Sequence, residues 1–199
     1  LVLDLGGQYA QLIARRIREA RVYSELVPHS LTAAEARARR PRALVLSGGP
    51  ASVYAPGAPR VDPGLFELGV PTLGICYGMQ LMAQDLGGTV ERTGISEFGK
   101  TEVHSEGESE LFAGLPTEQV GWMSHRDSVT APPAGARVTG RSPAAPIAAF
   151  EDPKRGLYGV QFHPEVVHTP HGTDLLKNFL YSVADAPPTW TAAAVIEEQ

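Results

Sequence analysis

The stretch Val70-Pro71-Thr72-Leu73-Gly74-Ile75-Cys76-Tyr77-Gly78-Met79-Gln80 decides how this chain is expected to fold. Its apolar first half predicts a buried strand, and the residues from Met79 to Leu86 predict a helix. Glycines on both sides of Cys76 suit a tight turn with a strained residue at its apex. Strand, turn and helix with a reactive side chain at the turn form a nucleophile elbow, and the helix N-terminus favours a thiolate. The alternative is a buried structural cysteine.

The segments around this stretch predict alternating strands and helices. Apolar runs at 1–4, 22–27, 43–46 and 70–75 are the expected strands, and helical patterns begin near residues 10, 32, 65, 79 and 174. Such alternation predicts an α/β fold with a mostly parallel, doubly wound central sheet flanked by helices. Shorter strands separated by Gly and Pro predict a smaller antiparallel sheet in the C-terminal half: 90–91, 100–104, 120–123, 137–140, 147–150 and 157–162.

Composition limits the classes of function. The 199 residues carry a net charge of −5, and no block of Lys and Arg favours nucleic acid as a partner. No apolar run approaches the ~20 residues that span a bilayer, so no membrane partner is expected. The single cysteine cannot form an internal disulfide, which favours a cytoplasmic protein. We expect one domain over residues 1–184 and a separate tail over 185–199.

A cysteine nucleophile needs a base and a group that orients the base. The segment Gly159-Val160-Gln161-Phe162-His163-Pro164-Glu165 supplies both, because an apolar strand ends at His163 and Glu165 follows two residues later. Open α/β sheets place their sites at the carboxyl ends of strands, so Cys76 and His163 are expected to meet. The three candidate catalytic residues are therefore Cys76, His163 and Glu165.

Acyl transfer also needs donors for the developing oxyanion. The turn Ser47-Gly48-Gly49-Pro50 follows a predicted parallel strand, and we expect the backbone N–H groups of Gly49 and Tyr77 to be the two donors. A tight turn without function is the alternative interpretation. A second alternative is a pyrophosphate loop of the Ser-Gly-Gly-x-Asp-Ser type, but Ala51 replaces its aspartate.

The histidines of the C-terminal half do not predict a metal site. His163, His168 and His171 share no helical face, prolines interrupt them, and no second cysteine can contribute a ligand. We therefore expect neither a metal nor another cofactor in this domain.

Three of these segments together resemble a known family. The elbow from Gly74 to Gln80, the turn Ser47-Gly48-Gly49-Pro50 and the segment Phe162-His163-Pro164-Glu165 are similar to the signatures of class I, triad-type glutamine amidotransferases. The resemblance covers residues 1–184 and implies a flavodoxin-like fold. It further implies that L-glutamine is the substrate, that Cys76 attacks its side-chain amide, and that Gln80 helps to bind it.

Further segments resemble the branch of this family that serves GMP synthetases: Asp4 to Tyr9, Glu97-Phe98-Gly99, Trp122 to Asp127 and Pro164 to Thr169. In that branch ammonia aminates xanthosine monophosphate (XMP), and ATP and Mg²⁺ belong to the partner synthetase domain. The resemblance implies that Ser124, His125 and Asp127 hold the amino-acid end of glutamine, with Asp127 on its ammonium group. Arg126 departs from the small residue of that pattern. The resemblance also places Glu97-Phe98-Gly99 near the partner domain.

The tail resembles the linker that opens a synthetase domain of the ATP-pyrophosphatase type. Residues 190–199 predict an amphipathic helix with nothing in this chain to cover it, so we expect a synthetase partner in the same polypeptide or in a separate polypeptide. A homodimer is expected for the full-length enzyme. The alternatives are a different acceptor (anthranilate, aminodeoxychorismate, carbamoyl phosphate or CTP synthesis), a stand-alone γ-glutamyl hydrolase, or a non-catalytic module.

Overall fold

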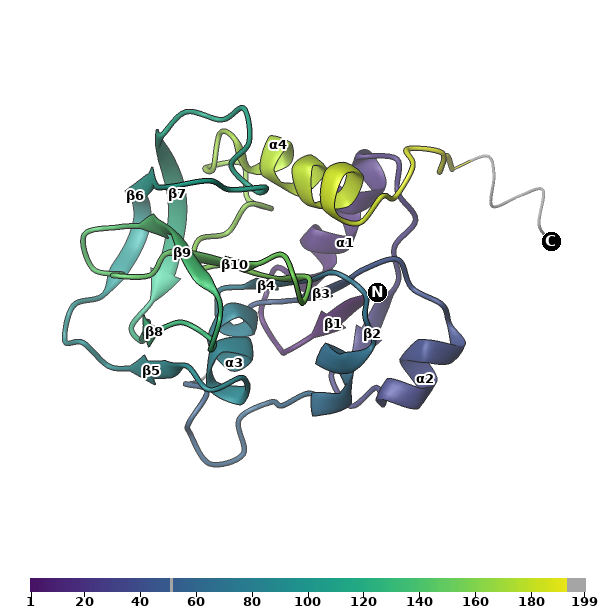
Figure 1. Ribbon diagram of the computed structural model, residues 1–199, viewed down its shortest axis with the longest axis horizontal. Helices are drawn as coiled ribbons and strands as arrows, with labels where there is room; N and C mark the ends of the chain where they lie inside the picture. Colours follow the sequence, from purple (N-terminus) through teal and green to yellow (C-terminus); the bar gives the residue numbers. More distant parts are fainter. Residues whose placement is uncertain (51, 193–199) are drawn as a thin grey trace.

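A computed structural model describes residues 1–50 and 52–192, and its centre is a mixed sheet. Within these residues nine strands pair in the order β2-β1-β3-β4-β11-β10-β9-β6-β7, and β5 and β8 form a separate pair (Figure 1). The strands are β1 (Val2–Asp4), β2 (Leu26–Pro28), β3 (Leu44–Leu46), β4 (Thr72–Ile75), β5 (Thr89–Glu91), β6 (Glu97–Ser105), β7 (Glu118–His125), β8 (Ser128–Ala131), β9 (Arg137–Arg141), β10 (Ala149–Asp152) and β11 (Leu157–Val160).

The first five strands of the sheet, β2-β1-β3-β4-β11, are parallel to one another. Strands β3, β4 and β11 are buried at every position, as expected of parallel strands covered on both faces. Their register aligns Leu46 with Gly74 and Ile75 with Val160. The carboxyl ends of β3, β4 and β11 therefore lie next to one another.

The remaining strands are antiparallel, which confirms the prediction made from the shorter strands of the C-terminal half. Most of them extend the central sheet, and only β5 and β8 make the small separate sheet. No strand is predicted from the sequence over β8, because its four residues are too few and too polar to form a strand pattern. The predicted strand at 22–27 begins only at Leu26, because Arg21 has a positive φ and the Ser24 side chain donates to the Ala14 carbonyl.

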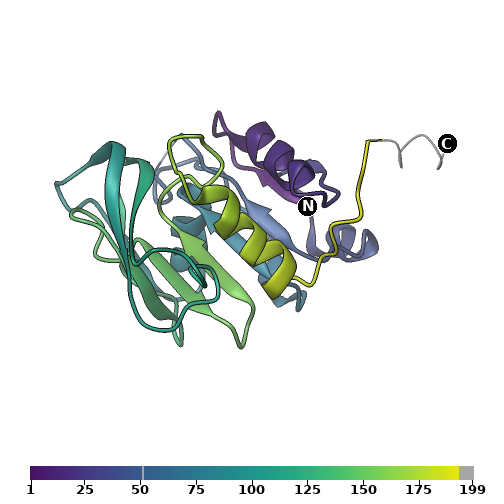
Figure 2. The ribbon, with the colours of Figure 1, turned by 90° about the horizontal axis from the view of Figure 1, so that it is seen from above.

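Helices cover both faces of the parallel half (Figures 1 and 2). They are α1 (Ala10–Glu19), α2 (Ala33–Ala38), the 3₁₀ turn η1 (Pro63–Glu67), α3 (Tyr77–Asp85), α4 (Gly172–Lys177) and the π-helical turn η2 (Asn178–Val183). One hydrophobic cluster joins α1, α4 and η2 to one face, and the other joins α2, η1 and α3 to the opposite face. The α/β fold class with a doubly wound sheet is thus confirmed.

Two helix predictions illustrate how local sequence acts. The predicted capping box at the start of α2 is present, since Thr32 and Glu35 satisfy each other's backbone N–H groups. The helix predicted at 174–183 starts at Gly172 and widens into η2 at Asn178. The Asn178 side chain donates to the carbonyls of Leu111 and Ala113, a contact with a distant loop that periodicity does not reveal.

The predicted helical tail lies mostly outside the described residues, which end at 192. Of its first residues, Trp190 donates its backbone N–H to the Arg21 carbonyl. The domain boundary near residue 184 therefore stays a prediction.

Gly78 offers a test of the contact between α3 and β3. A Cβ at this position would lie 2.4 Å from the Leu46 carbonyl oxygen, a backbone atom that can move away only if the main chain of β3 shifts. We expect Gly78→Ala to lower the free energy of unfolding by about 3 kcal/mol, measured by urea denaturation. The matched control is Gly57→Ala, where a Cβ meets nothing within 4 Å and only the positive φ costs about 1 kcal/mol. Equal losses in both variants would contradict the close contact.

Candidate active site

Cys76 lies at the turn between β4 and α3, where the sequence predicted a nucleophile. Its φ of 52° and ψ of −107° are unusual for a non-glycine residue and hold the side chain at the apex of the turn. The backbone N–H of Cys76 donates to the Val160 carbonyl, and the N–H of Gly78 donates to the Ser47 carbonyl. Backbone hydrogen bonds therefore connect the turn at Cys76 to the ends of both neighbouring strands, β11 and β3.

Glycine is required on both sides of this turn for steric reasons. A Cβ on Gly74 would lie 2.6 Å from the Met79 nitrogen, and a Cβ on Gly78 would collide with Leu46. The helix can therefore start directly beneath the strand, and its N-terminal dipole favours negative charge on Cys76.

His163 and Glu165 follow β11 and form a buried pair. The Nδ1 atom of His163 lies 2.7 Å from a carboxylate oxygen of Glu165, and both side chains are almost fully buried. Two contacts fix the position of this pair: the His163 N–H donates to the Trp122 carbonyl, and Arg16 donates to the Glu165 carbonyl. Since Nδ1 is engaged, Nε2 is the nitrogen left for chemistry.

His163 and Cys76 face each other across Gly48. A Cβ on Gly48 would lie 3.2 Å from the His163 Cε1 atom and 3.9 Å from the Cys76 Cβ. Burial lowers the pKa of His163, but the Cys76 side chain and then the Glu165 carboxylate raise it, so that the pKa lies well above its ordinary value of 6.5. The raised pKa favours the protonated over the neutral form of the His163 imidazole.

The two predicted oxyanion donors border the same space. Gly49 and Tyr77 line one cavity together with Cys76. Within the described part of the chain, neither of their backbone N–H groups has a hydrogen-bond acceptor. A Cβ on Gly49 would lie 2.8 Å from the Tyr77 ring, so only glycine fits there. Both N–H groups are available to an oxyanion.

The candidate site is a cavity of about 430 Å³ that adjoins a second one of about 320 Å³. Gly49, Pro50, Cys76 and Ser124 line both cavities. Gln80 lines the larger one, but its Nε2 donates to the Asp127 carbonyl and to the Gln161 side chain, which leaves Oε1 to face a ligand.

Ser124, His125 and Asp127 are also brought to the larger cavity. Ser124 is exposed, and Asp127 is buried with its carboxylate accepting from the hydroxyls of Ser52 and Tyr54. These two hydroxyls were not anticipated, because nothing in the sequence pairs a loop after β3 with a loop after β7.

His125 is held from both sides. Its Nδ1 lies 2.9 Å from the Asp127 carbonyl and its Nε2 lies 2.7 Å from the Glu97 carboxylate. Glu97 also accepts from the Ala144 N–H and from Ser142. Burial raises the pKa of Glu97, but the hydrogen bond to His125, followed by those from Ala144 and Ser142, lowers it below its ordinary value. Both ring nitrogens of His125 are thus engaged within the protein.

The structure offers less support for the two alternative sites, a pyrophosphate loop at Ser47 and a metal site. The Ser47 hydroxyl is fully buried, accepts from the Leu5 N–H and donates to Gly48, so it points away from any phosphate above the turn. Among residues 1–50 and 52–192 no group of three or more His, Cys, Asp or Glu side chains could hold a metal ion. No helix in these residues is long and apolar enough to cross a bilayer.

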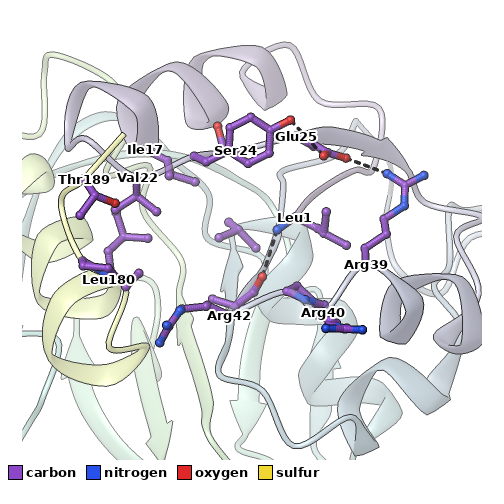
Figure 3. A pocket seen from close by; sticks show the side chains of 16 residues that line it. Leu1, Ile17, Val22, Ser24, Glu25, Arg39, Arg40, Arg42, Leu180 and Thr189 are labelled. Carbon is purple, nitrogen blue, oxygen red and sulfur yellow. Dashed lines mark hydrogen bonds and ion pairs between the residues drawn. The ribbon is translucent and has the colours of Figure 1, made fainter. Parts of the chain in front are cut away.

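A cavity of about 330 Å³ lies at the opposite ends of the parallel strands (Figure 3). It is lined at the starts of β1 and β3 by Leu1 and Val45, and by Arg39, Arg40 and Arg42. Arg39 pairs with Glu25, and Arg42 contacts Asp185. It shares no lining residue with the two cavities at Cys76 and is separate from the candidate site.

The raised pKa of His163 predicts that this side chain contributes to stability in a pH-dependent way. Because its pKa is raised above 6.5 in the folded chain, this contribution is present below about pH 6.5 and is lost as the pH rises through the raised pKa. We expect the free energy of unfolding of the wild type to exceed that of His163→Asn by more at about pH 6 than at about pH 9. Urea denaturation at the two pH values measures this difference.

A matched experiment in a Cys76→Ala background identifies the cause. Since the sulfur is one of the groups that raise the pKa of His163, the pH dependence should be smaller there. If the wild type exceeded His163→Asn in free energy of unfolding by the same amount at both pH values, the raised pKa of His163 would be contradicted.

Comparison with known proteins identifies the family. The model of the class-I glutamine amidotransferase family matches residues 1–183. The chain is 62% identical over 198 residues to a GMP synthase [glutamine-hydrolyzing] from Parafrankia and 58% identical to that of Thermobifida fusca. The alignments cover 100% of this chain but only 37% and 38% of these relatives. The chain therefore spans little more than a third of their length.

Solved structures agree with this assignment. A protein from Thermoplasma acidophilum, described as a candidate component of a GMP synthase, superposes with a TM-score of 0.80 at 29% identity, covering 100% of this chain and 96% of that one. A glutamine amidotransferase from Thermotoga maritima shares the fold, with a TM-score of 0.72 at 21% identity over 93% of this chain and 98% of that one. From its matching family model and its fold, the chain belongs to the class-I glutamine amidotransferases.

Proposed function

We propose that this chain hydrolyses L-glutamine to glutamate and ammonia through Cys76, His163 and Glu165. The observation that carries the proposal is the placement of Cys76 and His163 on either side of Gly48, with Glu165 bonded to the far nitrogen of the imidazole. Nucleophile, base and orienting carboxylate are the parts that amide hydrolysis requires.

In the first half of the reaction the Cys76 sulfur attacks the side-chain carbonyl carbon of glutamine. The carbonyl oxygen becomes negative and accepts from the N–H groups of Gly49 and Tyr77. His163 then gives its Nε2 proton to the leaving nitrogen, so that ammonia departs and a γ-glutamyl thioester remains on Cys76.

In the second half the neutral His163 takes a proton from water, which attacks the thioester and releases glutamate. Glu165 keeps the Nδ1 hydrogen in place through both halves, so Nε2 is always the nitrogen that exchanges protons. No metal or cofactor is proposed in this domain.

The amino-acid end of glutamine is proposed to lie against Ser124 and Asp127. Asp127 is the acidic side chain of the cavity and suits an ammonium group, while the free Oε1 of Gln80 offers an acceptor nearby. His125 acts through the segment it holds, because both of its ring nitrogens are already bonded.

The ammonia is proposed to serve a synthetase that converts XMP to GMP. Relatives named GMP synthase support this acceptor over anthranilate, aminodeoxychorismate, carbamoyl phosphate or CTP synthesis. ATP and Mg²⁺ would bind in the synthetase part. The synthetase part could be a further domain of the same polypeptide, because the GMP synthase relatives are much longer than this chain. It could also be a separate polypeptide, because the Thermoplasma chain is about as long as this one. A homodimer of the full-length enzyme stays a prediction.

Removal of the nucleophile tests the mechanism. We expect Cys76→Ala to abolish glutaminase activity of the chain and glutamine-dependent GMP formation by the complete enzyme. GMP formation from added ammonium salts should persist, since the synthetase reaction does not use the sulfur. Release of glutamate by the variant at the wild-type rate would overturn the proposal.

Replacement of Asp127 tests substrate binding. Asp127→Asn removes the charge proposed to pair with the ammonium group, so the KM for glutamine should rise about 10- to 100-fold with a smaller change in kcat. The control is Asp185→Asn, whose side chain is 99% exposed and contacts Arg42 instead of the candidate site. Glutaminase kinetics measure both parameters, and an unchanged KM in Asp127→Asn would contradict this placement.

A further inference from the structure

Gln161 lies fully buried directly after β11 and contacts the proposed nucleophile. Its Nε2 lies 3.5 Å from the Cys76 sulfur, and its Oε1 accepts from the Nε2 of Gln80 at 3.0 Å. A buried amide bears two donors and an acceptor that must find partners, so its position is costly unless both ends are used.

The orientation of this amide follows from the main-chain carbonyl of Asp127. That carbonyl can only accept, and it receives both His125 Nδ1 and Gln80 Nε2. The amide nitrogen of Gln80 must therefore point toward Asp127 and Gln161. Gln161 must present its oxygen to this nitrogen, which leaves its own N–H groups directed at the sulfur.

We propose that Gln161 is a further catalytic residue that donates a hydrogen bond to the Cys76 sulfur and stabilises it as a thiolate. The inference rests on the proposed role of Cys76 as the nucleophile. The thiol proton goes to Nε2 of His163, and no bond other than S–H is broken in this step. An N–H donor has no strong acceptor in a neutral thiol but a good one in a thiolate, so it favours the charged form.

The hydrogen bond from Gln161 favours the thiolate, whereas another contact of the same sulfur favours the thiol. The Ser124 carbonyl oxygen lies 3.6 Å from the sulfur and accepts from the thiol, which favours the neutral form. The titratable groups that border the cavities around Cys76 come from several segments, namely Tyr9, Tyr77, His125, Arg126, Asp127 and His163. Gln161 is an uncharged donor within hydrogen-bond distance of the sulfur, so its removal should favour the thiol over the thiolate.

The test is alkylation of Cys76 by iodoacetamide as a function of pH. Cys76 is the only cysteine of the chain, so the rate reports on one sulfur. We expect Gln161→Leu to move the midpoint of the rate profile up by about one pH unit, with about tenfold slower alkylation below both midpoints. The 199-residue chain is used, and thermal unfolding verifies that each variant is folded.

Gln161→Glu is the second variant and preserves the shape of the side chain. Its carboxylate still accepts from Gln80, but it presents an oxygen in place of a donor to the sulfur, so the midpoint should rise by more than in Gln161→Leu. The matched control is Gln119→Leu, a buried glutamine whose amide donates to the Pro116 carbonyl and not to Cys76. This control should keep the wild-type midpoint.

A folded Gln161→Glu variant with the wild-type midpoint would overturn the inference, whether or not Gln161→Leu folds. This failure is distinct from failure of the proposed function, because alkylation does not depend on glutamine hydrolysis. Loss of glutaminase activity in Cys76→Ala together with an unmoved midpoint in the Gln161 variants would keep the mechanism and reject only the role of Gln161.

Discussion

The parallel pairing of β4 with β3 on one side and β11 on the other is the constraint on which the site depends. It sets three strand ends side by side, so that the elbow at Cys76, the turn at Gly48 and the segment ending at His163 converge. The close approach of α3 to β3, which Gly78 permits, then fixes the start of the helix beneath the sulfur. Backbone hydrogen bonds between strands thus bring the reactive groups together before any side-chain contact is considered.

A chain of buried polar side chains runs from the sulfur through Gln161 and Gln80 to the Asp127 carbonyl, and on through His125 to Glu97. Such groups lose their hydration on burial, and each is stable only because its neighbour completes its hydrogen bonds. The network therefore specifies one arrangement, and it links the proposed nucleophile to the segment proposed to bind the amino-acid end of glutamine.

Much of the fold followed from local pattern. The apolar runs of β3 and β4 and the capping box at Thr32 depend on near neighbours, and the structure confirms them. β8 escaped prediction because its four residues are too few for a strand pattern. The late start of β2 and the π-helical turn at Asn178 escaped prediction because Ser24 and Asn178 contact residues elsewhere in the chain. For the same reason the hydroxyls of Ser52 and Tyr54 on Asp127 were not foreseen.

The sequence by itself determined the elbow at Cys76, the His163-Pro164-Glu165 segment and the alternation that predicts a doubly wound sheet, since these depend on residue type and spacing along the chain. Only the tertiary structure decided that Cys76 and His163 face each other across Gly48, and that the Gln161 amide is directed at the sulfur. The physical reason is that the direction of a buried amide is set by the acceptors around it, which here come from distant loops and strands.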